Sequence, residues 1–128
     1  MVTTLRSFSG FSVDDVDAAL RFYRDTLGLP ARTNDMGGLQ IELTEGSSVF
    51  VYPKGKDHTP ASYTVLNLVV PDIDKAVTEL EAAGVSLLRY PGFDQDERGV
   101  ARSTDPAQGP TIGWITDPAG NVIALIQD

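Results

Sequence analysis

The chain has 128 residues, of which 41% are hydrophobic and 22% charged, a composition typical of a globular domain with enough length for a core. Its formal net charge of −8 disfavours binding to the phosphate backbone of nucleic acids. The chain has no cysteine, which excludes disulfides, thiolate catalysis and zinc fingers. It has no apolar run near the ~20 residues of a membrane-spanning helix, and Met1 does not begin a secretion signal. We therefore expect a cytoplasmic protein that binds neither nucleic acid nor a membrane.

An internal repeat organises the chain. The sequence FSVDDVDAAL of residues 11–20 returns, like for like, as LVVPDIDKAV at residues 68–77. Such a repeat indicates one supersecondary unit that occurs twice. We expect a single domain over residues 1–128 with one module over about 1–58 and a second over about 62–128. Each module alone is too small to bury enough surface, so the modules share a core within one chain or pair through a partner chain.

The first module contains the pattern of a strand, a helix and three further strands. The strands are expected at residues 5–13, 31–35, 38–44 and 48–53. Asp14 or Asp15 caps the helix, which ends at Gly28. The apolar stripe of this helix consists of Val16, Ala19, Leu20, Tyr23 and Leu27. Residues 53–60 have the composition of a linker, so the lone histidine, His58, is interpreted as an exposed loop residue.

The second module repeats this order around a long loop. Its strands are expected at residues 63–70, 85–90, 111–116 and 121–126, the last two forming a hairpin. Asp72 caps the helix and Gly84 ends it. Residues 91–110, called the excursion below, have no counterpart in the first module, and loops of this length are often lids or binding loops. The order βαβββ occurs twice, which predicts an α+β fold.

Three phrases of the sequence resemble the vicinal oxygen chelate superfamily. They are VDDVDAALRFYRDTLG at residues 13–28, VPDID at residues 70–74 and DPAGNVI at residues 117–123. This family contains glyoxalases, bleomycin resistance proteins, fosfomycin resistance enzymes and extradiol dioxygenases. The resemblance implies two tandem βαβββ modules that form a curved, cup-shaped mixed sheet, usually within a homodimer. Because that fold supports many functions, the chemistry must be argued from the site.

The metal ligands of this family have no counterpart in the chain. In metal-using members, four side chains point into the cup and hold a divalent ion. Carried over by the resemblance, their positions fall on Phe8, Val51, Val65 and Ala124. None of these side chains has a lone pair suited to a divalent cation, and one histidine cannot complete a two-histidine-one-carboxylate iron site. We therefore expect no metal and no other cofactor.

The predicted ligand site is the lining of the cup. Strand alternation and the resemblance together predict the ligand-binding residues Phe8, Ser12, Gln40, Glu42, Val51, Val65, Asn67, Arg102, Trp114 and Ala124. Asn67 either makes a structural hydrogen bond or orients a ligand. Trp114 is either a stacking platform for a flat ligand or a core residue. Arg102 either closes over an anionic or carbonyl group or is a solvated loop charge.

An apolar cup with few polar groups favours ligand capture. The leading hypothesis is a metal-independent binding protein, similar to the bleomycin-resistance branch, that sequesters a hydrophobic or cationic drug or natural product and has no catalytic residue. The alternative is a metal-free enzyme of lyase or isomerase type, in which burial would raise the pKa of Glu42 so that it acts as general base. A third possibility is a metal enzyme with a site elsewhere in the chain.

Overall fold

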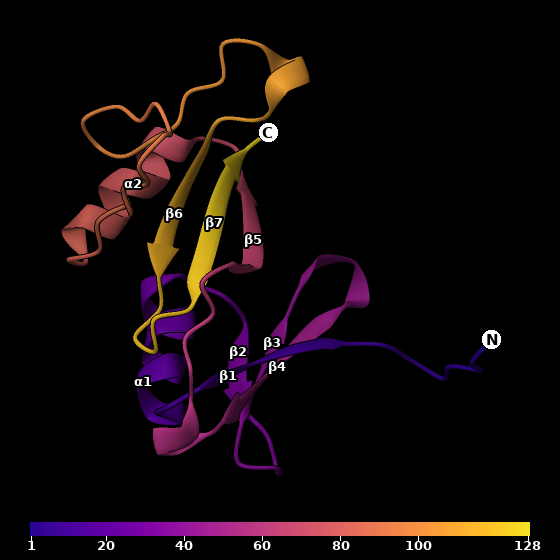
Figure 1. Cartoon of the computed structure of the whole chain (residues 1–128). Coiled ribbons are helices and arrows are strands. Elements are labelled where there is room, and N and C mark those ends of the chain that lie inside the picture. The colour runs from indigo at the N-terminus through magenta and orange to yellow at the C-terminus, as the bar shows by residue number, and fades with distance from the viewer. The chain divides into compact units, whose positions relative to one another are not determined.

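The computed structural model describes all 128 residues, which form two compact units, Met1–Pro60 (unit 1) and Ala61–Asp128 (unit 2), shown in Figure 1. Each unit combines a mixed sheet with a helical segment, so the chain has the α+β class expected from its sequence. Short 3-10 turns lie at Thr44–Gly46, Gly55–Asp57 and Pro106–Gln108. None of the helices combines the length and the apolar character that crossing a membrane would require.

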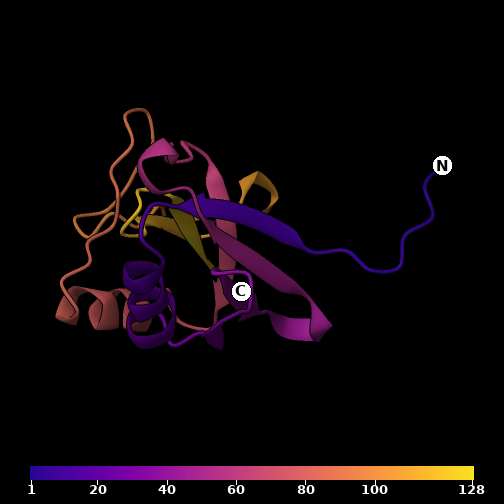
Figure 2. The same ribbon diagram turned by 90° about the horizontal axis from the view of Figure 1, so that it is seen from below.

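Unit 1 contains a four-stranded sheet with the order β1-β4-β3-β2. Its strands are β1 (Ser9–Val13), β2 (Ala31–Thr33), β3 (Leu39–Glu42) and β4 (Ser48–Pro53). Strand β1 runs parallel to β4, and the other neighbours are antiparallel. β1 is shorter than the strand expected over residues 5–13, and Figure 2 shows the N-terminal segment extending away from the sheet.

Residue alternation gives the unit 1 sheet two different faces. Val13, Ile41 and Val51 are fully buried on the face that carries the core. The opposite face, which we call the helix-free face, holds Gln40 and Phe50, and these two residues are only partly buried. A period of two residues along each strand produces this separation of aliphatic and mixed side chains.

The helical segment of unit 1 changes register after its first turn. Helix α1 (Val16–Leu20) is capped by the Asp15 carboxylate, which accepts a hydrogen bond from the Ala18 N–H at 3.1 Å. A π-helical segment follows at Arg21–Thr26. This wider turn rotates the buried stripe relative to a regular helix. The buried residues are Ala19, Phe22 and Tyr23, whereas Leu20 and Leu27 of the predicted stripe are only partly buried.

Unit 2 contains a three-stranded sheet with the order β5-β7-β6. Its strands are β5 (Thr64–Val70), β6 (Ile112–Thr116) and β7 (Val122–Gln127). Helix α2 (Ile73–Ala82) begins at Asp72, whose carboxylate accepts a hydrogen bond from the Lys75 N–H at 3.1 Å. Gly84 follows the helix with a positive φ of 82°, a conformation that favours glycine, so both predicted ends of the helix are confirmed.

The strand expected over residues 85–90 is not formed, which makes unit 2 βαββ rather than βαβββ. Leu88 donates one backbone hydrogen bond to β6. Two further backbone groups of this segment, the Leu88 carbonyl and the Tyr90 N–H, pair with the side chain of Gln95. The Gln95 amide donates to the carbonyls of Leu88 at 2.8 Å and Gly99 at 2.7 Å, and it accepts from the Tyr90 N–H at 2.8 Å. The Gln95 side chain thus makes hydrogen bonds that a neighbouring strand would otherwise make.

Gln95→Ala is expected to lower the free energy of unfolding by about 2 kcal/mol, because three hydrogen bonds are lost and two carbonyls and one N–H lose their partner. Urea unfolding of the purified variant measures this change. Gln108→Ala is the matched control, since it truncates another glutamine of the excursion that makes no such side-chain bonds. Equal stability of the two variants would contradict the role assigned to Gln95.

Candidate functional site

The four predicted cup positions lie in different environments. Phe8 is 53% exposed, just before β1. Val51 and Ala124 are fully buried. Val65 lies where the pairing register of β5 with β7 shifts, between Thr64 and Leu66, so it has no partner in the ladder. Thr64 precedes this irregularity and pairs with Val122, which is two residues from Ala124 and so lies on the same face of β7. Thr64 therefore takes the cup position that was predicted for Val65.

The placement of Val51 on the cup side is wrong by one residue. Gly10 pairs with Phe50, and Asn67, the residue that corresponds to Gly10 in the sequence repeat, pairs with Ala124. Phe50 is therefore the counterpart of Ala124, and it lies on the helix-free face. Val51 instead belongs to the buried core of unit 1.

The corrected positions do not supply a metal site. Phe50 has no donor atom, and Thr64 offers a single hydroxyl oxygen. No group of three or more histidine, aspartate or glutamate side chains in the chain is close enough together to hold a metal ion. The residues present therefore do not fit the divalent ion that the resemblance associates with this fold.

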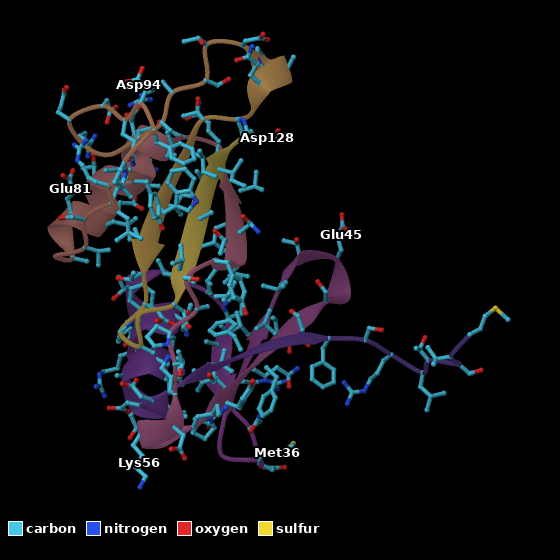
Figure 3. All side chains as sticks on the ribbon, in the orientation of Figure 1. Met36, Glu45, Lys56, Glu81, Asp94 and Asp128 are labelled. Carbon is cyan, nitrogen blue, oxygen red and sulfur yellow. The ribbon has the colours of Figure 1, made fainter.

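Two predicted site residues, Phe8 and Gln40, meet in a hollow of about 150 Å³ on unit 1. The residues that line this unit 1 hollow are Arg6, Phe8, Asn34, Met36, Gln40, Ser48 and Phe50. The Arg6 guanidinium lies 5.0 Å from the centre of the Phe8 ring, within cation–π distance. Met36, labelled in Figure 3, lies in the turn between β2 and β3.

Glu42 is not the buried carboxylate that the enzymatic alternative requires. Its Oε1 atom accepts hydrogen bonds from the Gln40 amide at 2.7 Å and from the Arg32 guanidinium at 3.2 Å. Its side chain is 42% exposed. It lines a hollow of about 390 Å³ together with Leu29, Pro30, Ala31 and two arginines, and one of these arginines, Arg32, pairs with it.

Ser12 and His58 form a hydrogen-bonded pair. The Ser12 Oγ and His58 Nδ1 atoms are 2.8 Å apart, and both residues are partly buried. The interpretation of His58 as an exposed loop residue is therefore wrong. This contact ties the segment after β4 to β1, because Ser12 lies in that strand.

Asn67 and Trp114 lie on the same row of the unit 2 sheet as Ala124, one strand to each side. The Asn67 side chain is exposed and makes no hydrogen bond within the chain, so a structural hydrogen bond is not its role here. Orientation of a ligand stays a prediction for this residue.

Trp114 lies at the centre of an aromatic cluster. Its ring centre is 5.2 Å from that of Tyr90, with an interplanar angle of 87°, and 5.2 Å from that of Phe93, with an angle of 67°. These edge-to-face arrangements are favourable for aromatic pairs. Phe93 nevertheless remains 57% exposed. The cluster therefore presents aromatic surface to solvent as well as packing internally.

The aromatic cluster separates two hollows of unit 2. The larger, called the excursion hollow, has a volume of about 430 Å³. Its lining consists of Phe93, Asp94, Ala101, Arg102, Ser103, Thr104, Asp105, Gln108, Gly109, Pro110, Ile112 and Trp114. A smaller hollow of about 220 Å³ shares Phe93 and Trp114 with it and also includes Tyr63 and Tyr90. Trp114 and Arg102, both predicted site residues, thus meet in the excursion hollow.

The guanidinium of Arg102 is held by two carboxylates. It forms a bidentate pair with Asp74 of α2, at 2.5 and 3.1 Å, and donates a third hydrogen bond to Asp96 at 3.1 Å. Hydrogen bonding to Asp74 is the main reason why the pKa of Arg102 is raised, and the same contact lowers the pKa of Asp74. Arg102 is thus an exposed loop charge, as one of its two interpretations expected, but its guanidinium is paired and is not free to bind an anion.

A second arginine holds the excursion against the same helix. Arg98 donates to the Glu81 carboxylate at 3.0 Å and to the Thr78 hydroxyl at 2.9 Å. Figure 3 shows the label of Glu81 on α2, below the loop. Two arginines thus connect the excursion to α2 at separate points along the helix, and the excursion forms one wall of its hollow.

Acidification is expected to loosen this wall. Burial raises the pKa of Asp96, but hydrogen bonds from the N–H groups of Val100 and Arg98 lower it by more, so its pKa is reduced, as is that of Asp74. A carboxyl with a lowered pKa in the folded state adds stability above about pH 4, and this stability is lost as the pH falls through the folded value. The fluorescence of Trp114 should therefore change as the pH is lowered from about 4 towards 2.

Asp74→Asn provides the control for this acid effect, because it removes one titrating group from the wall. Its fluorescence change over the same acidic range should be smaller than that of the wild type. An identical change in both proteins would show that the contacts of Asp74 do not govern the excursion.

The sequence did not single out Phe50 as a site residue. The one-residue error in the alignment of the two modules put Val51 in the cup and left Phe50 out. Phe50 alternates with Val49 and Val51 along β4, so this strand has one aromatic and one aliphatic face. Phe93 and Tyr90 flank the start of the excursion, and their contact with Trp114 spans more than twenty positions of sequence. Only the three-dimensional structure brings these rings together.

Comparison with known proteins places the chain among relatives of this architecture. A sequence model described as the Glyoxalase/Bleomycin resistance protein/Dioxygenase superfamily matches residues 7–125. The virulence protein STM3117 of Salmonella typhimurium is 28% identical over 123 residues, which cover 91% of this chain and 78% of that protein.

Two solved structures share the fold. TnmS3, an antibiotic binding protein from Streptomyces sp. CB03234, has a TM-score of 0.65 and 24% identity, with 98% of each chain covered. The oxidase ChaP-H2 has a TM-score of 0.69 and 21% identity, covering 98% of this chain and 95% of that one. At these identities the likeness establishes the fold alone.

Proposed function

Because the chain belongs to the glyoxalase/bleomycin resistance protein/dioxygenase superfamily, we propose that it is a metal-independent binding protein that holds an organic small molecule without converting it. One relative by fold is an antibiotic binding protein and another is an oxidase, so the fold does not decide between binding and catalysis. The observation that supports binding is the excursion hollow, in which Phe93 and Trp114 offer aromatic surface to a ligand. Its volume of about 430 Å³ is within the range of small-molecule sites.

The polar side chains around this hollow support the same proposal, because several of them make hydrogen bonds within the excursion. The Ser103 hydroxyl donates to the carbonyl of Gly109 at 2.7 Å. The Asp105 carboxylate accepts from the Ala107 N–H at 3.0 Å. Arg102 is paired as described above. A general acid or base needs a proton-transferring atom directed at its substrate, and these groups are directed at the backbone or at each other.

Glu42 lines a hollow of unit 1, but its surroundings do not provide the buried carboxylate that the enzymatic alternative requires. Its carboxylate is ion-paired with Arg32 and belongs to unit 1. The alternative retains a direct test, because Glu42→Gln would abolish conversion of a substrate if this residue were the general base. Under the proposal made here, neither the wild type nor this variant converts its ligand.

We further propose that the ligand is an antibiotic or other natural product and that the protein is a homodimer. TnmS3 supplies a precedent for the first, on the same fold. The second follows from the family resemblance and from the small size of each unit. Light scattering of the purified protein measures its mass directly, and a monomer at micromolar concentration would contradict the homodimer.

A thermal-shift screen against antibiotics and natural products tests the proposal. A ligand that binds only the folded state at 100 times its Kd adds about 2.7 kcal/mol of stability, which raises the Tm. We expect at least one compound to do so and to be recovered unchanged by mass spectrometry. Time-dependent appearance of a product would contradict binding without conversion.

A further inference from the structure

The excursion hollow has a charge pattern that its aromatic cluster does not explain. The single guanidinium in its lining, that of Arg102, is paired with Asp74 and Asp96. Two other carboxylates in the lining, those of Asp94 and Asp105, have no cationic partner. The paired arginine has no free charge for an anion, so the hollow is negative overall. Such a site raises the local concentration of cations and disfavours anions.

The aromatic rings in the same hollow favour a second property of the ligand, a flat aromatic group. Phe93 is 57% exposed although it contacts Trp114, so part of its ring remains available for another flat group. The faces of aromatic rings are electron-rich and attract cations as well as other rings. A ligand that joins a positive charge to an aromatic plane uses both features of the hollow.

We infer that the excursion hollow binds a planar aromatic cation, with its rings against Phe93 and Trp114 and its positive charge beside Asp94. This inference rests on the proposed function and narrows it to one class of ligand. Asp94 lies in the excursion (Figure 3) and is exposed, so its carboxylate is accessible to a ligand. Arg102 also lines the hollow, but its guanidinium is paired with Asp74 and Asp96, so it acts here as a positioning residue for the wall.

The chain provides its own reporter for this site. Trp114 is the only tryptophan of the protein, and it lines the excursion hollow. Quenching of its fluorescence therefore measures binding close to the hollow. Three probes of nearly the same shape separate charge from ring area: an aminoacridine that is cationic at neutral pH, uncharged acridine, and acridine carboxylate, which is anionic.

The cationic aminoacridine is expected to bind at least tenfold more tightly than acridine, and acridine carboxylate more weakly than either. Asp94→Asn should weaken binding of the cation about fivefold and leave binding of acridine unchanged. Raising the salt concentration should reduce the advantage of the cation. Glu97→Gln is the matched control, because it removes one negative charge from the same loop at a residue that does not line the hollow. We expect it to change the affinity less than twofold.

Each other outcome overturns this inference. Equal affinity for the cation and the neutral probe, tighter binding of the anion, or equal effects of the Asp94 and Glu97 variants would show that charge at this hollow does not select the ligand. Absence of quenching by all three probes would rule out the ligand class. None of these results decides the proposed function, which fails only when a compound from the natural-product screen is converted or when no compound in the screen binds.

Discussion

Replacing Asp117 by alanine is expected to lower the free energy of unfolding by about 3 kcal/mol. Asp117 is only 4% exposed, in the turn between β6 and β7. Its Oδ1 atom accepts hydrogen bonds from the N–H groups of Ala119 at 2.9 Å and Asn121 at 2.8 Å. Its Oδ2 atom accepts a third from the Asn121 side-chain amide at 3.1 Å. Alanine would leave these buried donors without their acceptor, which costs more than the loss of an exposed hydrogen bond.

Chemical denaturation measures this loss, and Asp105→Ala is the matched control. Asp105 also accepts a hydrogen bond from the N–H two residues later, but it is exposed. Its replacement should cost about 1 kcal/mol or less, because water can satisfy the freed N–H. A loss at Asp117 no larger than the loss at Asp105 would contradict the account of the turn.

Trp114→Ala is expected to weaken binding of the compound with the largest thermal shift about thirtyfold, a loss of about 2 kcal/mol. Trp114 lines both hollows of unit 2, so its removal takes aromatic surface from each. Aromatic side chains at the centre of a site commonly account for losses of this size. Calorimetric titration measures the affinity without relying on the fluorescence that the variant lacks.

Two variants separate loss of ligand contact from loss of folding. Trp114→Phe keeps a ring beside Tyr90 and Phe93, and it should retain an intermediate affinity. Phe8→Ala removes an exposed ring from the unit 1 hollow, which does not include Trp114, and it should leave the affinity nearly unchanged. If Trp114→Ala and the wild type bound that compound with equal affinity, the ligand site would lie outside the two hollows of unit 2.

Local signals in the sequence predicted most of the fold. The caps at Asp15 and Asp72 act on N–H groups three residues away, so they can be recognised without knowledge of the tertiary structure. The missing strand over residues 85–90 could not be predicted in this way. Two of its backbone groups, the Leu88 carbonyl and the Tyr90 N–H, pair with Gln95, a side chain in a loop that strand patterns do not describe. The π-helical register at Arg21–Thr26 likewise has no sequence signal that periodicity alone reveals.

The site was predictable only in part. Strand alternation correctly placed Gln40 on the helix-free face, because the aliphatic residues beside it mark the core. It failed at Val51, where an alignment of the two modules was one residue out and a single step changes the face of a strand. The pairing of Arg102 with Asp74 could not be foreseen, since it joins a long loop to a helix.

Incubation of the protein with an equimolar amount of the compound found by the thermal-shift screen tests the central claim most directly. The compound is then released by denaturation and quantified by mass spectrometry over several hours. The account predicts full recovery of the unchanged compound, at one molecule per site, with and without added divalent metal. Steady loss of the compound with appearance of a product that is absent from the protein-free control would contradict it.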